Sequence, residues 1–291
     1  MRRRDFLTSA ALFPALGAVP SSQGPAPPRP RSGLKLGTVT YNIAKDWDIP
    51  TIIRNLTEVG MEAVELRTTH RHGVEISLSP AARRDVRQQF ADSPIRIGGL
   101  GTVCEYHAAD PAVVRQNIEE TKAWVQLAQD VGSPGVKVRP NGIPKGVSEE
   151  KTLEQIGKAL AECGQAARDH GVLIQLEVHG AQTSRLPAIR TIMDHSGNHP
   201  GVRVCWNSNP TDLLDGGFEP AFNLVKHQIG QVHMRDLFVE DYPWRTLLTS
   251  LASMPFDGYC FAEIPESSDP LRVLKYYRAL FLAYQGLCLA R

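Results

Sequence analysis

Eight short apolar runs recur along the chain from Gly33 onward, and they constrain its fold more than any other feature of the sequence. Amphipathic, helix-like stretches separate them. Successive runs start 27, 33, 40, 37, 30, 27 and 29 residues apart, a spacing that fits one β-strand plus one crossover helix. The runs are continuously apolar, as strands buried on both faces of a parallel sheet are. They are residues 35–40, 62–66, 95–100, 135–139, 172–178, 202–206, 229–234 and 258–264.

The number of these units favours a closed barrel over an open sheet. Eight units in about 259 residues match the size of a (β/α)8 barrel. A doubly wound sheet usually carries a G-x-G-x-x-G loop after its first strand, whereas here Tyr41, Asn42 and Ile43 follow the first run. We therefore predict an α/β chain with one TIM barrel over residues 33–291.

The first 32 residues have the composition of an export signal. A basic cluster precedes an apolar run, residues 6–19, which is interrupted by Pro14 and is too short to span a bilayer as a helix. Residues 3–7, RRDFL, resemble the twin-arginine export motif. Residues 21–32 are rich in proline and serine and read as a linker. The sequence thus predicts a periplasmic or extracytoplasmic protein exported by the twin-arginine machinery. The alternative is a frayed basic terminus of a cytosolic protein.

The charge and the cysteines exclude some classes of protein. The chain has a formal net charge of +1, and residues 1–32 carry five arginines and one aspartate, or +4, which leaves −3 for the rest. An acidic body argues against nucleic-acid binding, which needs a basic surface. The five cysteines form no C-x-x-C pair and are expected to be buried thiols rather than disulfides.

Each of four successive predicted strands ends in a residue that could bind a metal ion. Glu177, Asn207, His233 and Glu263 follow one another at intervals of 30, 26 and 30 residues, and strand ends carry the chemistry of such barrels. A carboxylate in an apolar strand is costly unless something compensates its charge. A divalent cation does so most simply, and this ligand set suits Mn²⁺, Mg²⁺, Co²⁺ or Zn²⁺. The alternative is that these four residues are ordinary polar side chains at strand ends, each with its own hydrogen-bond partners and no shared metal.

Three segments around these residues carry a family resemblance. LEVHG, VHMRD and FAEIP resemble the fifth-, seventh- and eighth-strand motifs of the xylose isomerase-like TIM barrels, the sugar-phosphate isomerase/epimerase superfamily. The resemblance implies that Glu177 and Glu263 bind the metal and exchange protons on opposite faces of a sugar. The family's sixth strand usually presents Asp, with His three residues later. Here Asn207 and Pro210 stand at these positions, which removes one negative charge from the ligand set.

Further residues near the strand ends are weaker candidates. His179 shares a strand face with Glu177, while Lys137 and Arg139 share a face of the fourth strand and could bind an anionic or keto oxygen. Asp236 is expected to orient His233, as carboxylates beside metal-ligating histidines do. The complete set of expected substrate contacts is His107, Lys137, Arg139, His179, Trp206 and Arg235.

These features together predict a metal-dependent sugar isomerase or epimerase that removes a proton beside a carbonyl and passes through an enediolate. Export favours a carbohydrate without phosphate groups. One alternative is a lyase on 3-keto-glycosides, or an inosose-type dehydratase, which needs the same first step. Another is a barrel that binds sugar without catalysis. Endonuclease activity is disfavoured, because the fourth strand offers Lys137 and Arg139 where the endonuclease relatives carry an acid.

Overall fold

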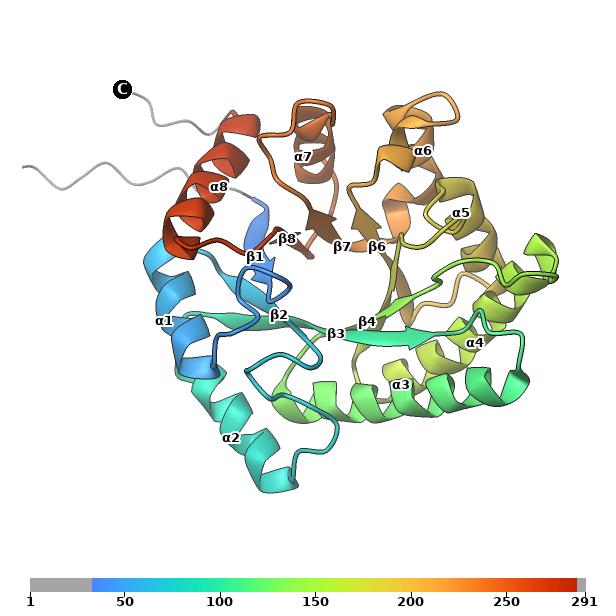
Figure 1. Ribbon diagram of the computed structural model, residues 1–291, viewed down its shortest axis with the longest axis horizontal. Helices are drawn as coiled ribbons and strands as arrows, with labels where there is room; N and C mark the ends of the chain where they lie inside the picture. Colours follow the sequence, from blue (N-terminus) through green and yellow to red (C-terminus); the bar gives the residue numbers. More distant parts are fainter. Residues whose placement is uncertain (1–32, 287–291) are drawn as a thin grey trace, which may run out of the picture.

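Eight parallel strands close into a barrel in the computed structural model, which describes residues 33–286 (Figure 1). Each strand pairs with its neighbour in sequence, and the eighth pairs with the first. The predicted TIM barrel is therefore confirmed, whereas the predicted export signal and linker lie outside the described residues. The strands are β1 Lys35–Val39, β2 Ala63–Arg67, β3 Arg96–Glu105, β4 Gly135–Arg139, β5 Leu173–Glu177, β6 Val202–Asn207, β7 Ile229–Met234 and β8 Tyr259–Ala262.

A ring of helices surrounds the strands (Figure 1). Several helices begin at a residue whose side chain accepts a hydrogen bond from the first turn, such as Asp48, Ser148 and Asp269. No helix among residues 33–286 is long and apolar enough to cross a membrane. The helices are α1 Ile49–Val59, α2 Pro80–Ala91, α3 Pro111–Val131, α4 Glu149–Asp169, α5 Leu186–His195, α6 Phe218–Val225, α7 Trp244–Ala252 and α8 Pro270–Tyr284.

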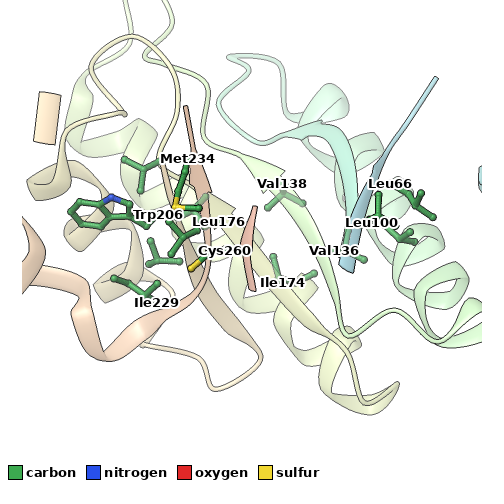
Figure 2. Packing of buried hydrophobic residues seen from close by; sticks show 14 of the residues in the cluster. Leu66, Leu100, Val136, Val138, Ile174, Leu176, Trp206, Ile229, Met234 and Cys260 are labelled. Atoms are coloured by element: carbon green, nitrogen blue, oxygen red, sulfur yellow. The ribbon is translucent and has the colours of Figure 1, made fainter. Parts of the chain in front are cut away.

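Alternate strand residues face the helices and the barrel interior, which divides apolar from polar side chains. The outward set, including Leu100, Val136 and Ile174, forms the continuous core between strands and helices (Figure 2). Inside the barrel, Phe261 is fully buried. A Cβ atom added at Gly98 would lie 2.6 Å from its ring, so a side chain there would displace it. Apolar packing thus closes the lower part of the barrel and leaves the polar residues near its C-terminal mouth.

Four of the five cysteines lie in the described part of the chain and confirm the prediction of buried thiols. Cys104, Cys163, Cys205 and Cys260 are all free and buried.

Trp206 faces the helical layer, and its predicted role as a substrate contact is wrong. Because Asn207 faces the barrel interior, the alternation of the strand turns Trp206 outward. Its fully buried ring packs edge-on against Phe218 and Phe222 of α6, with ring centroids 5.8 and 5.6 Å away. Its Nε1–H donates to the Tyr242 hydroxyl over 3.0 Å. A sugar in the barrel mouth therefore cannot reach this ring.

The hydroxyl of Tyr242 continues this contact to a buried acid and joins two loops. It donates to Asp212 Oδ2 over 2.6 Å, and the same oxygen accepts from the backbone N–H of Asn209. Burial raises the pKa of Asp212 to about 7, against the opposing effect of these hydrogen bonds. The cluster connects the β6–α6 loop to the segment before α7, and it holds Asn209 beside the mouth of the barrel.

The raised pKa of Asp212 predicts a pH-dependent stability. A carboxyl group with a pKa of about 7 in the folded protein and 3.8 as its ordinary value binds its proton more tightly when folded. Stability therefore falls as the pH rises from about 4 to about 7. Asp212→Asn keeps an acceptor for Tyr242 but carries no charge. We expect the Tm of this variant to depend less on pH than that of the wild type, as measured by thermal unfolding at about pH 4.5 and pH 8.

The exposed Asp257 provides the control, because Asp257→Asn should retain the pH dependence of the wild type. An Asp212→Asn profile parallel to that of the wild type would contradict the assignment.

Candidate metal centre and substrate pocket

A cavity of about 440 Å³ lies at the C-terminal ends of the strands. Two other hollows lie between α3 and α4 and between α6 and α7, on the outer helical layer and away from the strand ends. The cavity is thus where a TIM barrel places its chemistry. It is lined by Tyr41, Asn42, Arg67, Lys137, Arg139, Glu177, His179, Asn207, Asn209, Glu263, Ile264 and Pro265.

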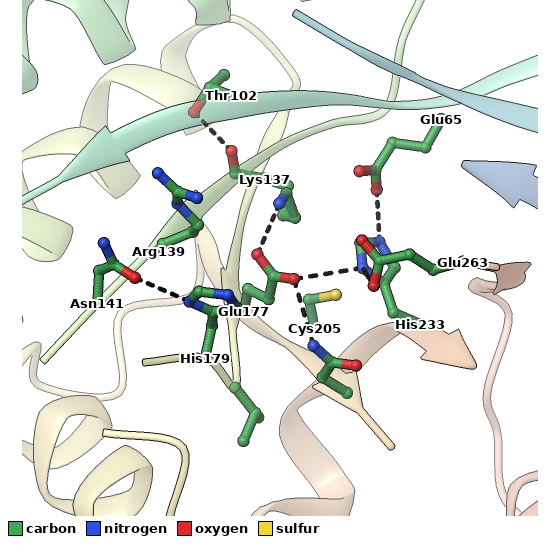
Figure 3. Close-up of polar contacts among 12 residues, drawn as sticks. Glu65, Thr102, Lys137, Arg139, Asn141, Glu177, His179, Cys205, His233 and Glu263 are labelled. Atoms are coloured by element: carbon green, nitrogen blue, oxygen red, sulfur yellow. Dashed lines mark hydrogen bonds and ion pairs between the residues drawn. The ribbon is translucent and has the colours of Figure 1, made fainter. Parts of the chain in front are cut away.

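Three of the four predicted metal ligands come together at this cavity (Figure 3). One ligand atom each from Glu177, His233 and Glu263 lie within 4.8 Å of one another. His233 Nδ1 is 3.5 Å from Glu177 Oε1 and 3.4 Å from Glu263 Oε2. This nitrogen is buried and has no hydrogen-bond partner among the described residues. Two carboxylates and an imidazole around such an atom form a donor set that fits a divalent cation.

Glu65 prepares His233 for this role from the far side of its ring. His233 Nε2 lies 2.9 Å from Glu65 Oε2, and both side chains are fully buried. Although burial opposes ionisation of Glu65, His233 and Lys137 lower the pKa of this carboxyl below its ordinary value. An ionised carboxylate only accepts hydrogen bonds, so His233 Nε2 carries a proton toward Glu65, and Nδ1 is the nitrogen left for a metal. Burial lowers the pKa of His233, but Cys205, Glu65 and Glu263 outweigh burial and raise it well above its ordinary value, so a metal at Nδ1 would take the place of a proton there.

Glu65 is a functional residue that sequence reasoning missed. It occurs in the run EAVEL, and the available signal was a carboxylate inside an apolar strand. Its space is provided by β3, because a Cβ atom at Gly101 would lie 2.6 Å from Glu65 Oε1. Its contact with His233 replaces the predicted one from Asp236, which is wrong. Asp236 follows the end of β7, and the described chain shows no bond between it and His233.

Lys137 lies inside the ligand cluster and not only at the rim. Its Nζ is 2.6 Å from Glu177 Oε2, and both side chains are almost completely buried. Burial opposes the ionisation of Glu177, but the charges of Lys137 and His233 outweigh it and hold the pKa of this carboxyl well below its ordinary value. One oxygen of Glu177 is thus bound to an ammonium group, and only Oε1 faces His233.

Asn207 completes the ring of strand-end residues. Its Nδ2 lies 3.4 Å from Glu177 Oε1, which places the amide beside the ligand cluster. The nitrogen and oxygen of an amide are assigned from their surroundings, and the opposite assignment presents Oδ1 at the same position. Asn207 is therefore placed to supply the fourth ligand, without the charge that an aspartate brings.

The other predicted contacts divide into cavity-lining and remote residues. Lys137, Arg139 and His179 line the cavity. His107 and Arg235 do not. His107 Nδ1 lies 3.3 Å from Glu105 Oε2.

Arg235 forms an ion pair of 2.7 Å with Asp241, and its guanidinium lies over the ring of Tyr242. Both residues of this pair lie past the end of β7, and Arg235 is not among the residues that line the cavity. The structure therefore does not place Arg235 at the cavity, and its contact with substrate stays a prediction.

Arg67 at the end of β2 lines the cavity and was also missed. Its guanidinium donates to the carbonyl of Thr68 and lies over the ring of Tyr41, 5.2 Å from the centroid. No carboxylate among residues 33–286 forms an ion pair with it. The sequence feature that could have indicated Arg67 is its position two residues after Glu65, which places both side chains on the same face of the strand.

Removing Lys137 tests the charge balance of the cluster. Lys137→Met leaves a buried carboxylate without its ammonium partner, which should cost about 3–5 kcal/mol of stability in metal-free protein. Added Mn²⁺ should restore part of the loss, because it supplies positive charge at the same carboxylate. Urea unfolding with EDTA and with Mn²⁺ measures both effects.

Lys158→Met is the matched control, since the Lys158–Glu154 pair is exposed and its loss should have no measurable effect. Equal stability of the two variants would contradict the role of Lys137.

Comparison with known proteins places this barrel among related ones. Residues 53–280 match the family described as xylose isomerase-like TIM barrel. A comparison with curated protein sequences gives no match.

Among solved structures, the chain resembles 3-keto-D-glucoside 4-epimerase YcjR from E. coli, with a TM-score of 0.72, 14% identity and coverage of 86% of this chain and 99% of that chain. It resembles the IolI protein with a bound zinc atom (TM-score 0.71, 15% identity, 86% and 99% coverage). It also resembles D-psicose 3-epimerase with D-tagatose from Clostridium cellulolyticum H10 (TM-score 0.73, 12% identity, 86% and 99% coverage).

At these identities the structural likeness shows a common fold, whereas the sequence match covers most of the chain. The chain belongs to the xylose isomerase-like TIM barrel family.

Proposed function

We propose that this protein is a metal-dependent isomerase or epimerase of a sugar without phosphate groups. The observation that carries the proposal is the convergence of Glu177, His233 and Glu263 at the mouth of the barrel, with their ligand atoms within 4.8 Å. The names of the similar structures support it, because two are sugar epimerases and one holds zinc.

Glu177, Asn207, His233 and Glu263 would hold the metal ion, which when bound supplies a Lewis acid that polarises a carbonyl group and stabilises negative charge on its oxygen. The residues themselves prepare this site. Glu65 binds the proton on His233 Nε2, which turns Nδ1 toward the metal site, and Lys137 keeps Glu177 ionised. Any of Mn²⁺, Mg²⁺, Co²⁺ or Zn²⁺ is compatible with the donor set.

The two carboxylates that exchange protons are not equivalent. The side chain of Glu263 is 22% exposed, whereas that of Glu177 is 3% exposed. Glu263 therefore reaches the substrate more freely, and we assign it as the base that removes the proton beside the carbonyl. The proton returned from the opposite face comes from the Lys137 ammonium, 2.6 Å from Glu177 Oε2, and passes through Glu177, which is itself ionised. Lys137 is left neutral and regains a proton when the proton taken by Glu263 is released to solvent.

The charges around the cavity support a substrate without phosphate. Of the three cationic side chains that line it, Lys137 is paired with Glu177 and Arg139 with Glu105. Arg67 alone among them has no carboxylate partner in the described chain, so little uncompensated charge is left for a phosphate dianion. The predicted export by the twin-arginine machinery points in the same direction and rests on residues 1–32 of the sequence.

A lyase acting on 3-keto-glycosides is the second candidate. It starts with the same proton abstraction, and the similarity to a 3-keto-D-glucoside 4-epimerase favours a 3-keto substrate. The products separate the two functions, since a lyase releases the aglycone and an epimerase returns an isomer. A barrel that only binds sugar would show neither.

Replacing either carboxylate by an amide tests the proposal. Glu263→Gln and Glu177→Gln should each lower solvent deuterium incorporation next to the substrate carbonyl by about 100-fold or more, because an amide neither accepts a proton from the substrate nor passes one to it. The assay uses D-fructose, D-tagatose and a 3-keto-D-glucoside with Mn²⁺ in D₂O, followed by NMR.

Glu240→Gln, at an exposed position of the β7–α7 loop, should exchange at the wild-type rate. Exchange by Glu263→Gln at that same rate would disprove its assignment as the base.

A further inference from the structure

We infer that Glu105 and Asn141 are positioning residues that hold His179 with its proton on Nδ1, so that Nε2 faces the cavity as an acceptor for a substrate hydroxyl. The inference rests on the proposed function, because that function places a polyhydroxylated sugar in the cavity. It goes further by naming the atom that binds the sugar and by stating that this atom accepts a hydrogen bond. It also names the residues that make it an acceptor.

The first step is the ion pair of Glu105 with Arg139. Its Oε1 lies 2.6 Å from Arg139 Nη2. An arginine is always protonated in a protein and its guanidinium only donates hydrogen bonds, so Glu105 is the carboxylate acceptor of this ion pair. Both oxygens of Glu105 therefore only accept hydrogen bonds.

The second step fixes the amide of Asn141 and, through it, the imidazole of His179. Asn141 lies 2.7 Å from Glu105 Oε2 and can bind this acceptor only through Nδ2. Its Oδ1 then faces His179 Nδ1 at 2.9 Å (Figure 3). Two acceptors cannot share this contact, so His179 Nδ1 carries a proton, and in the neutral ring Nε2 keeps its lone pair.

The third step is the direction of Nε2. His179 lines the cavity, and no described residue forms a hydrogen bond with its Nε2. In Figure 3 this nitrogen lies on the Glu177 side of the ring. An acceptor here requires a donor from the ligand, and a sugar hydroxyl supplies one.

The backbone holds the chain of contacts in place. Asn141 has a φ of 59°, a left-handed conformation that asparagine tolerates better than most residues. Gly180 has a φ of 93°, and a Cβ atom there would lie 2.6 Å from Asn141 Cα. The two loops can approach so closely only with glycine at this position. The Thr183 hydroxyl also donates to the carbonyl of His179 over 2.7 Å.

The same logic predicts that one isosteric change reverses the tautomer. In Glu105→Gln, the side-chain oxygen faces Arg139 and the new NH₂ faces Asn141. The amide of Asn141 must then turn its Oδ1 toward residue 105 and its NH₂ toward His179. His179 Nδ1 becomes the acceptor, and its proton moves to Nε2.

Long-range ¹H–¹⁵N spectra of the full-length protein labelled with ¹⁵N-histidine test this directly at about pH 8, and a His179→Gln variant assigns the signals. We expect a proton on Nδ1 alone in the wild type and on Nε2 alone in Glu105→Gln. A proton on Nε2 in the wild type, alone or together with Nδ1, or an unchanged tautomer in Glu105→Gln, overturns the inference. Neither readout needs a substrate, so failure here is distinct from failure of the proposed function.

Kinetics provide the second measurement. With the substrate found in the deuterium assay, Glu105→Gln and Asn141→Ala should each lower kcat/KM about tenfold, mainly through KM. This equals the loss of one hydrogen bond of about 1.4 kcal/mol. Mn²⁺ affinity should not change, because no metal ligand is altered.

Asn223→Ala, at an exposed position on α6, is the matched control and should behave as the wild type. A wild-type kcat/KM in Glu105→Gln also overturns the inference.

Discussion

The ion pair between Lys137 and Glu177 is the interaction on which the rest of the site depends. Four ionisable side chains, Glu65, Lys137, Glu177 and His233, are buried together inside the barrel. Each charge would be costly alone, and the 2.6 Å contact between Lys137 and Glu177 offsets part of that cost before any metal binds. It also leaves one oxygen of Glu177 directed at the space shared with His233 and Glu263.

Two histidines at this mouth follow one physical rule. His233 contacts Glu65 through Nε2, and His179 contacts Asn141 through Nδ1. In each case a carboxylate, directly or through an amide, fixes the proton on the nitrogen that faces away from the cavity side. The opposite nitrogen is thereby turned toward the ligand that we propose for it, a metal in the first case and a hydroxyl in the second.

The sequence predicted the barrel and its four strand-end ligand candidates because both follow a regular period. It failed where the deciding contact crosses the barrel or depends on strand alternation. Glu65 on β2 contacts His233 on β7, a pairing that no local pattern indicates, whereas the sequence order favours the nearby Asp236. Trp206 cannot face the cavity together with Asn207, its neighbour on the same strand, because successive side chains of a strand point to opposite faces. The partners of Arg235 likewise come from a loop, whose course is not periodic.

The central claim is that a divalent cation binds beside the Lys137–Glu177 pair without displacing it. Crystals grown with Mn²⁺ and measured for anomalous scattering near the manganese edge test this most directly. The account predicts one strong anomalous peak within bonding distance of Glu177, Asn207, His233 and Glu263, with Lys137 still bound to the other oxygen of Glu177. No peak at this position, or a peak with Lys137 displaced from Glu177, would contradict it.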